Sequence, residues 1–181
     1  MNVIETGLDG CLLIKPNVFK DARGFFLESY HEKKYAEIGI TEKFVQDNRS
    51  RSVRNVLRGL HFQITKPQGK LVTVTAGEVF DVALDLRPNS STFGKYYSVI
   101  LSSEMNNQLY IPPGFAHGFC VLSEMADFQY KCTSFYDPKD EGGIIWSDDE
   151  INIAWPIENP IVSPKDEKLI SFAEFKSKVS E

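Results

Sequence analysis

Two of the three histidines in this 181-residue sequence lie in settings that suit proton transfer or metal binding. His61 lies in the stretch LRGLHFQ, residues 57–63, and His117 follows the turn sequence PPGFA, residues 112–116. Imidazole exchanges a proton near neutral pH, so either side chain can act as a general base, although each can equally be a core residue. The third, His31, lies in a charged stretch, and we expect it to be exposed and idle.

The sequence PPGFAH, residues 112–117, resembles half of the metal-binding signature of cupins, so a metal-dependent cupin is one interpretation. Such a site usually needs two more histidines close together and a carboxylate. Here the upstream segment reads His61-Phe62-Gln63, and glutamine is a poor ligand for transition metals. We therefore expect no metal site.

Three further side chains suit proton removal next to a carbonyl group. Lys70 precedes the apolar stretch LVTVT, where it is either a surface residue with a buried stem or a cation that stabilises an enolate oxygen. Tyr130 and Tyr136 share one face of a strand predicted over residues 127–136, because side chains alternate across a strand. Two such tyrosines either pack in a barrel, or one donates a proton while the other stacks on a base or sugar.

Arg23 and Arg58 hint at an anionic ligand, although each alone is typical of a surface charge. The sequence contains neither GxxxxGK[ST] nor GxGxxG, so side chains rather than a glycine-rich loop would bind a phosphate. The formal net charge of -5 argues against a basic face. We therefore expect neither nucleic acid nor an anionic membrane as a partner.

Short apolar stretches separated by turn residues dominate the sequence, and helix signals are few. Turn signals recur about every ten residues, which is typical of a β-sandwich or barrel. We expect an all-β fold, a cupin-type jelly roll or double-stranded β-helix with short peripheral helices. The predicted helices cover residues 32–38, ending at Gly39, and residues 165–179. The predicted strands cover residues 71–75, 79–86, 96–101, 108–111, 118–122 and 127–136.

The length predicts a single domain over residues 1–181, large enough to bury a core without disulfides or metal. Cys11, Cys120 and Cys132 form an odd set without CxxC spacing, which predicts free thiols in a reducing compartment. The first residues lack the basic and apolar regions of a signal peptide, and no apolar run reaches membrane-spanning length. We therefore expect a soluble cytoplasmic protein.

Taken as a set, the motifs resemble those of the dTDP-4-dehydrorhamnose 3,5-epimerase family and follow the family's order from about residue 5 to residue 167. The succession of RGLHFQ, PQGKLV and IPPGFAHGF is highly specific, whereas one block alone would not be. The full set is RGFFLESY (23–30), QDNRS (46–50), VLRGLHFQ (56–63), PQGKLV (67–72), GEVFDVALDLR (77–87), STFGKY (91–96), YIPPGFAHGF (110–119), ADFQYKCTSFY (126–136) and SPKD (163–166).

The resemblance implies a cofactor-free jelly-roll homodimer and assigns roles to particular residues. It makes His61 the base that removes the proton next to the C4 ketone and Asp166 the carboxylate paired with that base. Tyr130 matches the general acid, Lys70 the residue facing the C4 oxygen, and Tyr136 the ring that stacks on thymine. Further positions match substrate contacts, several to the nucleotide or diphosphate: Arg23, Glu28, Gln46, Asn48, Arg58, His117, Glu141 and Lys165.

The implied reaction is epimerisation at C3 and C5 of dTDP-4-dehydro-6-deoxy-D-glucose to dTDP-4-dehydro-L-rhamnose, a step of dTDP-L-rhamnose biosynthesis. The substrate already carries the ketone, so no redox cofactor is expected. One alternative is a mono-epimerase that inverts only C3 or C5 of a related nucleotide-linked 4-keto sugar. Another is a sugar-binding or metal-dependent cupin; a binding-only relative should lack at least one of His61, Lys70, Tyr130 and Asp166, and all four are present.

Overall fold

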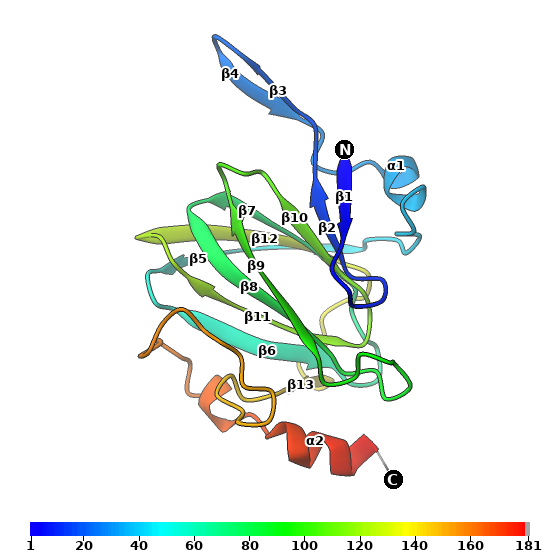
Figure 1. Ribbon diagram of the computed structural model, residues 1–181, viewed down its shortest axis with the longest axis vertical. Helices are drawn as coiled ribbons and strands as arrows, with labels where there is room; N and C mark the ends of the chain where they lie inside the picture. The colour runs from blue at the N-terminus through cyan, green and yellow to red at the C-terminus, as the bar shows by residue number, and fades with distance from the viewer. Residues whose placement is uncertain (180–181) are drawn as a thin grey trace.

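Antiparallel strands are the main secondary structure of the computed structural model, which describes residues 1–179 (Figure 1). The strands are β1 (Asn2–Glu5), β2 (Leu12–Lys15), β3 (Val18–Asp21), β4 (Gly24–Leu27), β5 (Gln46–Val53), β6 (Leu57–Gln63), β7 (Lys70–Ala76), β8 (Glu78–Asp85), β9 (Tyr96–Ser102), β10 (Gln108–Ile111), β11 (Phe115–Val121), β12 (Met125–Cys132) and β13 (Glu141–Gly143). One sheet has the order β1-β2-β10-β7-β12-β5, and the other has the order β13-β6-β11-β8-β9.

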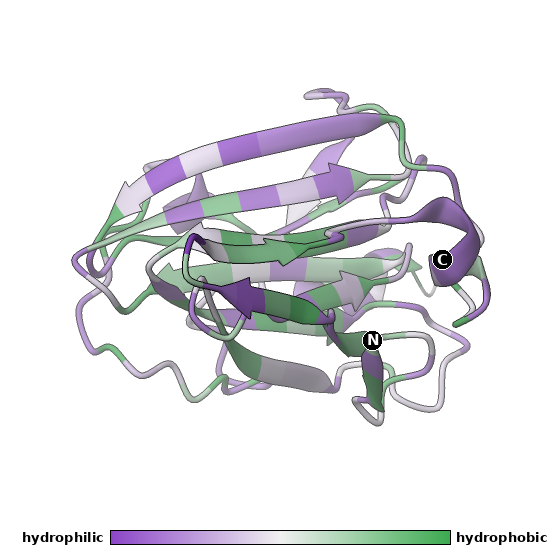
Figure 2. Ribbon diagram, turned by 90° about the horizontal axis from the view of Figure 1, so that it is seen from above, coloured by the Kyte–Doolittle hydropathy of each residue, from purple (hydrophilic) through white to green (hydrophobic). Residues whose placement is uncertain are grey.

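The two sheets pack face to face over one apolar core. Val72, Leu109 and Phe128 of the six-stranded sheet meet Val79 and Phe119 of the five-stranded sheet in this core. Figure 2 shows hydrophobic segments concentrated in the stacked strands at the centre of the molecule. This arrangement is the expected cupin-type jelly roll, in which inward residues of both sheets alternate with outward ones.

Short helices cover the outer faces of the sheets, as the sequence predicted. Helix α1 (Glu32–Ala36) places Tyr35 against the six-stranded sheet, and α2 (Phe172–Val179) places Phe172 and Phe175 against the five-stranded sheet. Strand β8 is therefore buried on both faces, which explains its nearly continuous apolar sequence. No helix among residues 1–179 is long and apolar enough to span a membrane.

The predicted strand over residues 127–136 is too long, because β12 ends at Cys132. After that residue, Thr133 N–H donates to Gly69 O and the Thr133 hydroxyl accepts from Gly69 N–H, so the chain leaves the ladder. Residues 133–140 form a loop that returns to start β13 beside β6. Tyr136 therefore lies on this loop and not on the strand face of Tyr130.

The predicted helix over residues 165–179 is interrupted. A single 3-10 turn, η1 (Asp166–Lys168), precedes α2, and Leu169 between them is extended. Ile170 forms a parallel bridge with Ile144, and its carbonyl accepts from Ile145 N–H. This long-range pairing outweighs the helical pattern of the segment. The first predicted helix is confirmed but shorter, and Gly39 has the expected left-handed conformation (φ +92°).

Strands β3 and β4 form a hairpin, hereafter the arm, that projects from the sandwich near the N-terminus (Figure 1). Three of its aromatic side chains are largely exposed: Phe19 at 63%, Phe25 at 60% and Phe26 at 68%. Clustered exposed aromatic residues are typical of a surface that packs against another molecule.

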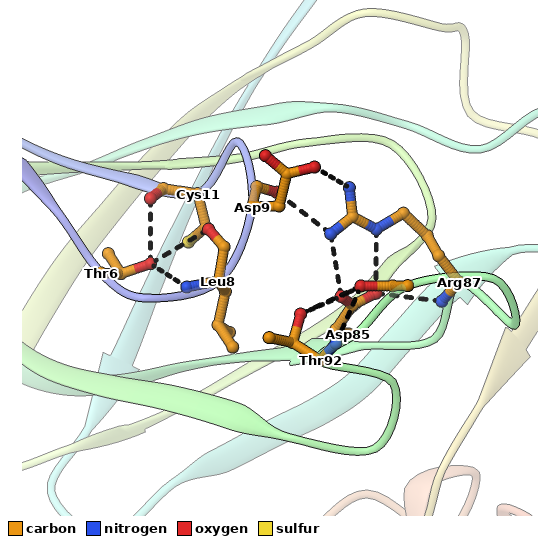
Figure 3. A network of polar contacts seen from close by, with 8 residues as sticks. Thr6, Leu8, Asp9, Cys11, Asp85, Arg87 and Thr92 are labelled. Atoms are coloured by element: carbon orange, nitrogen blue, oxygen red, sulfur yellow. Dashed lines mark hydrogen bonds and ion pairs between the residues drawn. The ribbon is translucent and has the colours of Figure 1, made fainter.

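A polar network closes the end of the sandwich where β8 leads into β9 (Figure 3). The buried Asp85 carboxylate accepts from Arg87 Nε (2.9 Å), Ser90 Oγ (2.6 Å) and Thr92 Oγ1 (2.6 Å). Arg87 also donates to the Asp9 carbonyl, which ties this connection to the loop after β1. The network satisfies a buried charge and fixes two loops in relation to each other.

Candidate active site

His61 of β6 and Asp166 of η1 form a hydrogen-bonded pair. The distance from His61 Nε2 to Asp166 Oδ1 is 2.7 Å, and the other carboxylate oxygen accepts from Gly59 N–H at 3.2 Å. Burial tends to raise the pKa of Asp166, but the His61 bond and the Gly59 N–H outweigh it and lower the pKa. An ionised Asp166 orients the ring, and when His61 Nε2–H donates to it, Nδ1 is the atom that can accept a proton.

His117 of β11 lies directly opposite His61 in the ladder, on the neighbouring strand of the same sheet. Its Nε2 is 2.9 Å from Asp81 Oδ2, and both side chains are buried. Burial lowers the pKa of His117 despite the nearby carboxylate, so the ring is neutral at physiological pH. Asp81 Oδ1 has no hydrogen-bond partner within residues 1–179.

Asp81 is the functional candidate that the sequence reasoning missed. It lies within VFDVALDL. Val79 and Ala83, two residues before and after it on the same strand face, belong to the core, so Asp81 occupies an inward position. A buried charge is costly unless it is paired, so an acidic residue at an inward position was the available signal. Its partner could not be read from the sequence, because that requires the register between β8 and β11.

Lys70 of β7 and Tyr130 of β12 approach the same space from the six-stranded sheet. Lys70 is 9% exposed, and its Nζ lies 5.8 Å from the centroid of the Tyr130 ring. No carboxylate among residues 1–179 forms a salt bridge with it, so this ammonium can donate to an anionic oxygen of a ligand. Burial lowers the pKa of Lys70 and raises the pKa of Tyr130 to about 12, so the phenol stays protonated at neutral pH.

Tyr136, Glu141 and Lys165 meet at the rim. The Tyr136 hydroxyl donates to Glu141 Oε2 at 2.6 Å, and Lys165 Nζ donates to the same oxygen. The bond to Glu141 raises the pKa of the half-exposed Tyr136 to about 12. Glu141 therefore joins the loop that follows β12 to the segment that carries Asp166.

A cavity of about 360 Å³ lies between the two sheets, and His61, His117, Lys70, Tyr130, Tyr136 and Glu141 line it. Phe119 and Phe128, stacked with ring centroids 3.9 Å apart, also line it. Eight of the predicted site residues face this one space: Asn48, Arg58, His61, Lys70, His117, Tyr130, Tyr136 and Glu141.

Asp166 and Lys165 contact lining residues from outside the cavity, and three predicted residues remain. Gln46 supports the cavity by donating to Asn48 Oδ1 at 2.9 Å. Arg23 and Glu28 are not brought to the cavity of their own chain. Arg23 pairs with Asp21 at the tip of the arm with its side chain 90% exposed, and Glu28 pairs with Lys34 of α1.

A transition-metal centre does not fit these residues. Within residues 1–179, no group of three or more histidine, cysteine, aspartate or glutamate side chains is placed to hold a metal ion. The two histidines that face the cavity each bind a separate carboxylate. The arrangement instead suits acid–base chemistry on a ligand that enters between the sheets.

Comparisons with known proteins agree with this geometry. A sequence profile described as dTDP-4-dehydrorhamnose 3,5-epimerase matches residues 5–174. The Shigella flexneri dTDP-4-dehydrorhamnose 3,5-epimerase is 55% identical over 92% of this chain and 93% of its own. A Streptomyces niveus dTDP-4-dehydrorhamnose 3-epimerase is 39% identical over 96% of this chain and 85% of its own.

Solved structures extend the likeness to the fold. The crystal structure of a Legionella pneumophila dTDP-6-deoxy-D-glucose-3,5-epimerase, in complex with dTDP-4-keto-L-rhamnose, is 52% identical and has a TM-score of 0.92. The match covers 96% of both chains. Profile, sequence identity and structure agree over nearly the whole chain, and this chain therefore belongs to the dTDP-4-dehydrorhamnose 3,5-epimerase family.

Proposed function

We propose that the protein epimerises dTDP-4-dehydro-6-deoxy-D-glucose at C3 and C5, giving dTDP-4-dehydro-L-rhamnose for dTDP-L-rhamnose biosynthesis. The observation that carries the proposal is one cavity with the oriented base His61 on one sheet and the protonated acid Tyr130 on the other. The Shigella flexneri and Legionella pneumophila 3,5-epimerases described above match 92% and 96% of this chain.

The first step is removal of the proton next to the C4 ketone by His61. That proton is far less acidic than an imidazolium, so the base succeeds only if the enolate is strongly stabilised. The buried ammonium of Lys70 supplies this stabilisation at the C4 oxygen, because a desolvated cation interacts strongly with a developing negative charge. Asp166 stabilises the imidazolium that forms.

Inversion requires that the new proton arrive on the opposite face of the sugar. His61 belongs to the five-stranded sheet and Tyr130 to the six-stranded sheet, so a sugar held between them presents one face to each. Tyr130 is protonated at neutral pH, so it can deliver a proton to carbon. The ketone is regenerated in the product, and the electron count is unchanged throughout.

The nucleotide is proposed to lie at the rim. Tyr136 stacks on thymine, while Arg58, His117, Gln46, Asn48, Glu141 and Lys165 contact the rest of the substrate. Tyr136 is half exposed and lies beside the cavity, so its ring is accessible to a base.

The active unit is proposed to be a homodimer in which the arm of one chain crosses to the partner. Three observations support this: the exposed aromatic residues of the arm, the position of the eight-residue strand β5 at the edge of its sheet, and the absence of Arg23 from the described residues that line the cavity. An uncovered sheet edge is a ready site for strand addition. Arg23 and Glu28 would then contact substrate in the partner's cavity.

We further propose that residues 1–181 act as one domain in the cytoplasm. Cys11, Cys120 and Cys132 are all free and buried, which suits a reducing compartment.

Incubation with dTDP-4-keto-6-deoxyglucose in deuterated water tests the proposed reaction. We expect deuterium at both C3 and C5 and a product of L-rhamno configuration. Exchange and inversion at one carbon only would assign the protein to the mono-epimerases, and absence of exchange would contradict epimerase activity altogether.

A further inference from the structure

Gln63 is a buried side chain close in sequence to His61, and the proposed chemistry gives it no role. It ends β6, two residues after His61, and is 4% exposed. Its Nε2 donates to the Lys66 carbonyl (2.9 Å) and to the Phe135 carbonyl (3.3 Å). Its Oε1 accepts from Asp137 N–H at 2.8 Å. The partners fix the orientation of the amide, because only NH₂ can face two carbonyls and only oxygen can face an N–H.

Two of these three bonds flank Tyr136. They hold the residue before it and the residue after it, and Tyr136 N–H donates to Gln46 Oε1 at 2.9 Å. Two glutamines from opposite sheets therefore hold three consecutive residues of the loop over residues 133–140. Because the Tyr136 ring is half exposed, its place depends on this backbone and on the hydrogen bond from its hydroxyl to Glu141 more than on packing.

Glutamine is the residue type that suits this position. Glutamate would turn a carboxylate oxygen toward two carbonyl oxygens, and methionine would fill the space without making any of the three bonds. Loss of the amide would leave the Asp137 N–H and two carbonyls to find other partners, so the loop would relax away from its present position.

We propose that Gln63 is a positioning residue that holds Tyr136 where the nucleotide base binds, and so contributes to recognition of the base. The inference rests on the proposed function, since it assumes that Tyr136 contacts thymine. Gln63 acts through the loop and touches neither the sugar nor the acid–base pair.

Binding of dTDP and of inorganic pyrophosphate to Gln63→Met, measured by calorimetry, tests the proposal. We expect dTDP to bind about ten-fold more weakly, because the lost bonds each contribute modestly, while pyrophosphate affinity stays unchanged. KM should rise with kcat nearly unchanged, because His61, Tyr130 and Lys70 remain in place. Gln129→Met is the matched control: Gln129 lies in β12, outside the loop, and its variant should match the wild type.

A double-mutant cycle with Tyr136→Ala separates positioning from general stability. Tyr136→Ala alone should weaken dTDP binding, and Gln63→Met should then have no additional effect. An equal loss for dTDP and pyrophosphate, or the same loss in both backgrounds, would overturn the proposal. If Gln63→Met does not fold, Gln63→Glu is measured with the same expectations.

The outcomes also distinguish this inference from the proposed function. Normal dTDP binding by Tyr136→Ala would remove Tyr136 from the base site and the inference with it, while deuterium exchange at the sugar would still test the reaction. Weak binding by Tyr136→Ala together with normal binding by Gln63→Met would overturn the inference alone.

Discussion

The pKa values of the ionisable side chains around His61 are shifted by different local causes. Hydrogen bonds outweigh burial and lower the pKa of Asp166, whereas burial lowers the pKa of His117 and raises the pKa of Tyr130, so each shift reinforces the charge state that the group has at neutral pH. On the roles proposed above, the cavity therefore contains an oriented base, His61, with its counter-charge and an acid, Tyr130, with its proton at the same pH. A base and an acid that are competent together are what inversion at carbon requires.

The base and the acid should therefore have separable phenotypes. We expect His61→Ala to abolish exchange of the sugar C–H protons, a loss of at least about 100-fold. Tyr130→Phe should retain some exchange but invert poorly, because the enolate can still form but is reprotonated from the face that lost the proton. NMR in deuterated water, with product stereochemistry, measures both. Normal inversion by Tyr130→Phe would remove Tyr130 from the role of acid.

Lys70 and Asp166 should also differ from residues that only bind the nucleotide. Lys70→Met should lower kcat far more than it weakens dTDP binding, because the cation acts mainly on the enolate. Asp166→Asn should lower kcat by disturbing the orientation and basicity of His61. Steady-state kinetics beside calorimetry of dTDP provides the comparison. Unchanged kcat in either variant would remove that residue from the catalytic set.

The pH profile should report Lys70 on its basic side. Burial lowers the pKa of Lys70 below its usual value near 10.4, so the ammonium loses its proton as pH rises toward that value. The enolate then loses the cation that stabilises it. Tyr130, with a pKa of about 12, keeps its proton over the same range. We expect kcat/KM to fall on the basic side at a lower pH than an ordinary lysine, with its pKa near 10.4, would give. Lys70→Arg should lack this fall in kcat/KM, because its guanidinium stays charged. If the fall is unchanged in Lys70→Arg, another group causes it.

At the scale of elements, the strands with strong local signals are confirmed, and the errors lie where distant segments meet. The stretch LVTVT lies in β7, and VFDVALDL lies in β8 except for its last residue, Leu86. Residues 133–136 were predicted to continue a strand, because nothing local shows that Gly69 replaces the ladder partners of Thr133. The same applies to Ile170, whose bridge to Ile144 interrupts a plausible helix.

The residues of the candidate site that lie in short motifs could be predicted from the sequence. The contacts that depend on the register between strands could not. His61, Lys70 and Tyr130 stand in motifs whose residue types already indicated acid–base chemistry. The pairing of His117 with Asp81 depends on the alignment of β8 and β11, which no local pattern specifies. The arm likewise separates Arg23 from the cavity that its motif indicated.

The arm provides a test of assembly. Phe26→Ser removes a large apolar side chain that is 68% exposed, so it should weaken association while leaving the fold of the chain intact. Sedimentation should show a shift from dimer toward monomer, with a parallel loss of activity. Ile161→Ser, at an exposed isoleucine outside the arm, is the control. A fully active monomeric wild type would contradict the proposed dimer.

For the molecule as a whole, the Asp85 network links folding stability to acidity. Hydrogen bonds from Arg87, Ser90 and Thr92 outweigh burial and hold the pKa of Asp85 at about 2. Because the folded pKa is lower than the unfolded value near 3.9, the contribution is complete above about pH 4 and is lost as pH falls toward 2.

Denaturant unfolding at several pH values measures this contribution. The wild type should lose roughly 2 kcal/mol through Asp85 between about pH 4 and pH 2. Asp85→Asn should have a lower free energy of unfolding at pH 7 and a shallower decline in that range. Parallel curves for the two proteins would show that Asp85 does not carry the acid sensitivity.

The position of Asp166 after the last strand has a consequence for biosynthesis on the ribosome. β13 ends at Gly143, so both sheets can close while the segment with Asp166 is still in the exit tunnel. A nascent sandwich at that stage contains the His61 imidazole but not the carboxylate that orients it. If His61 is the base, as proposed, proton abstraction would become efficient only after the jelly roll has formed, and the fold would be acquired before the activity.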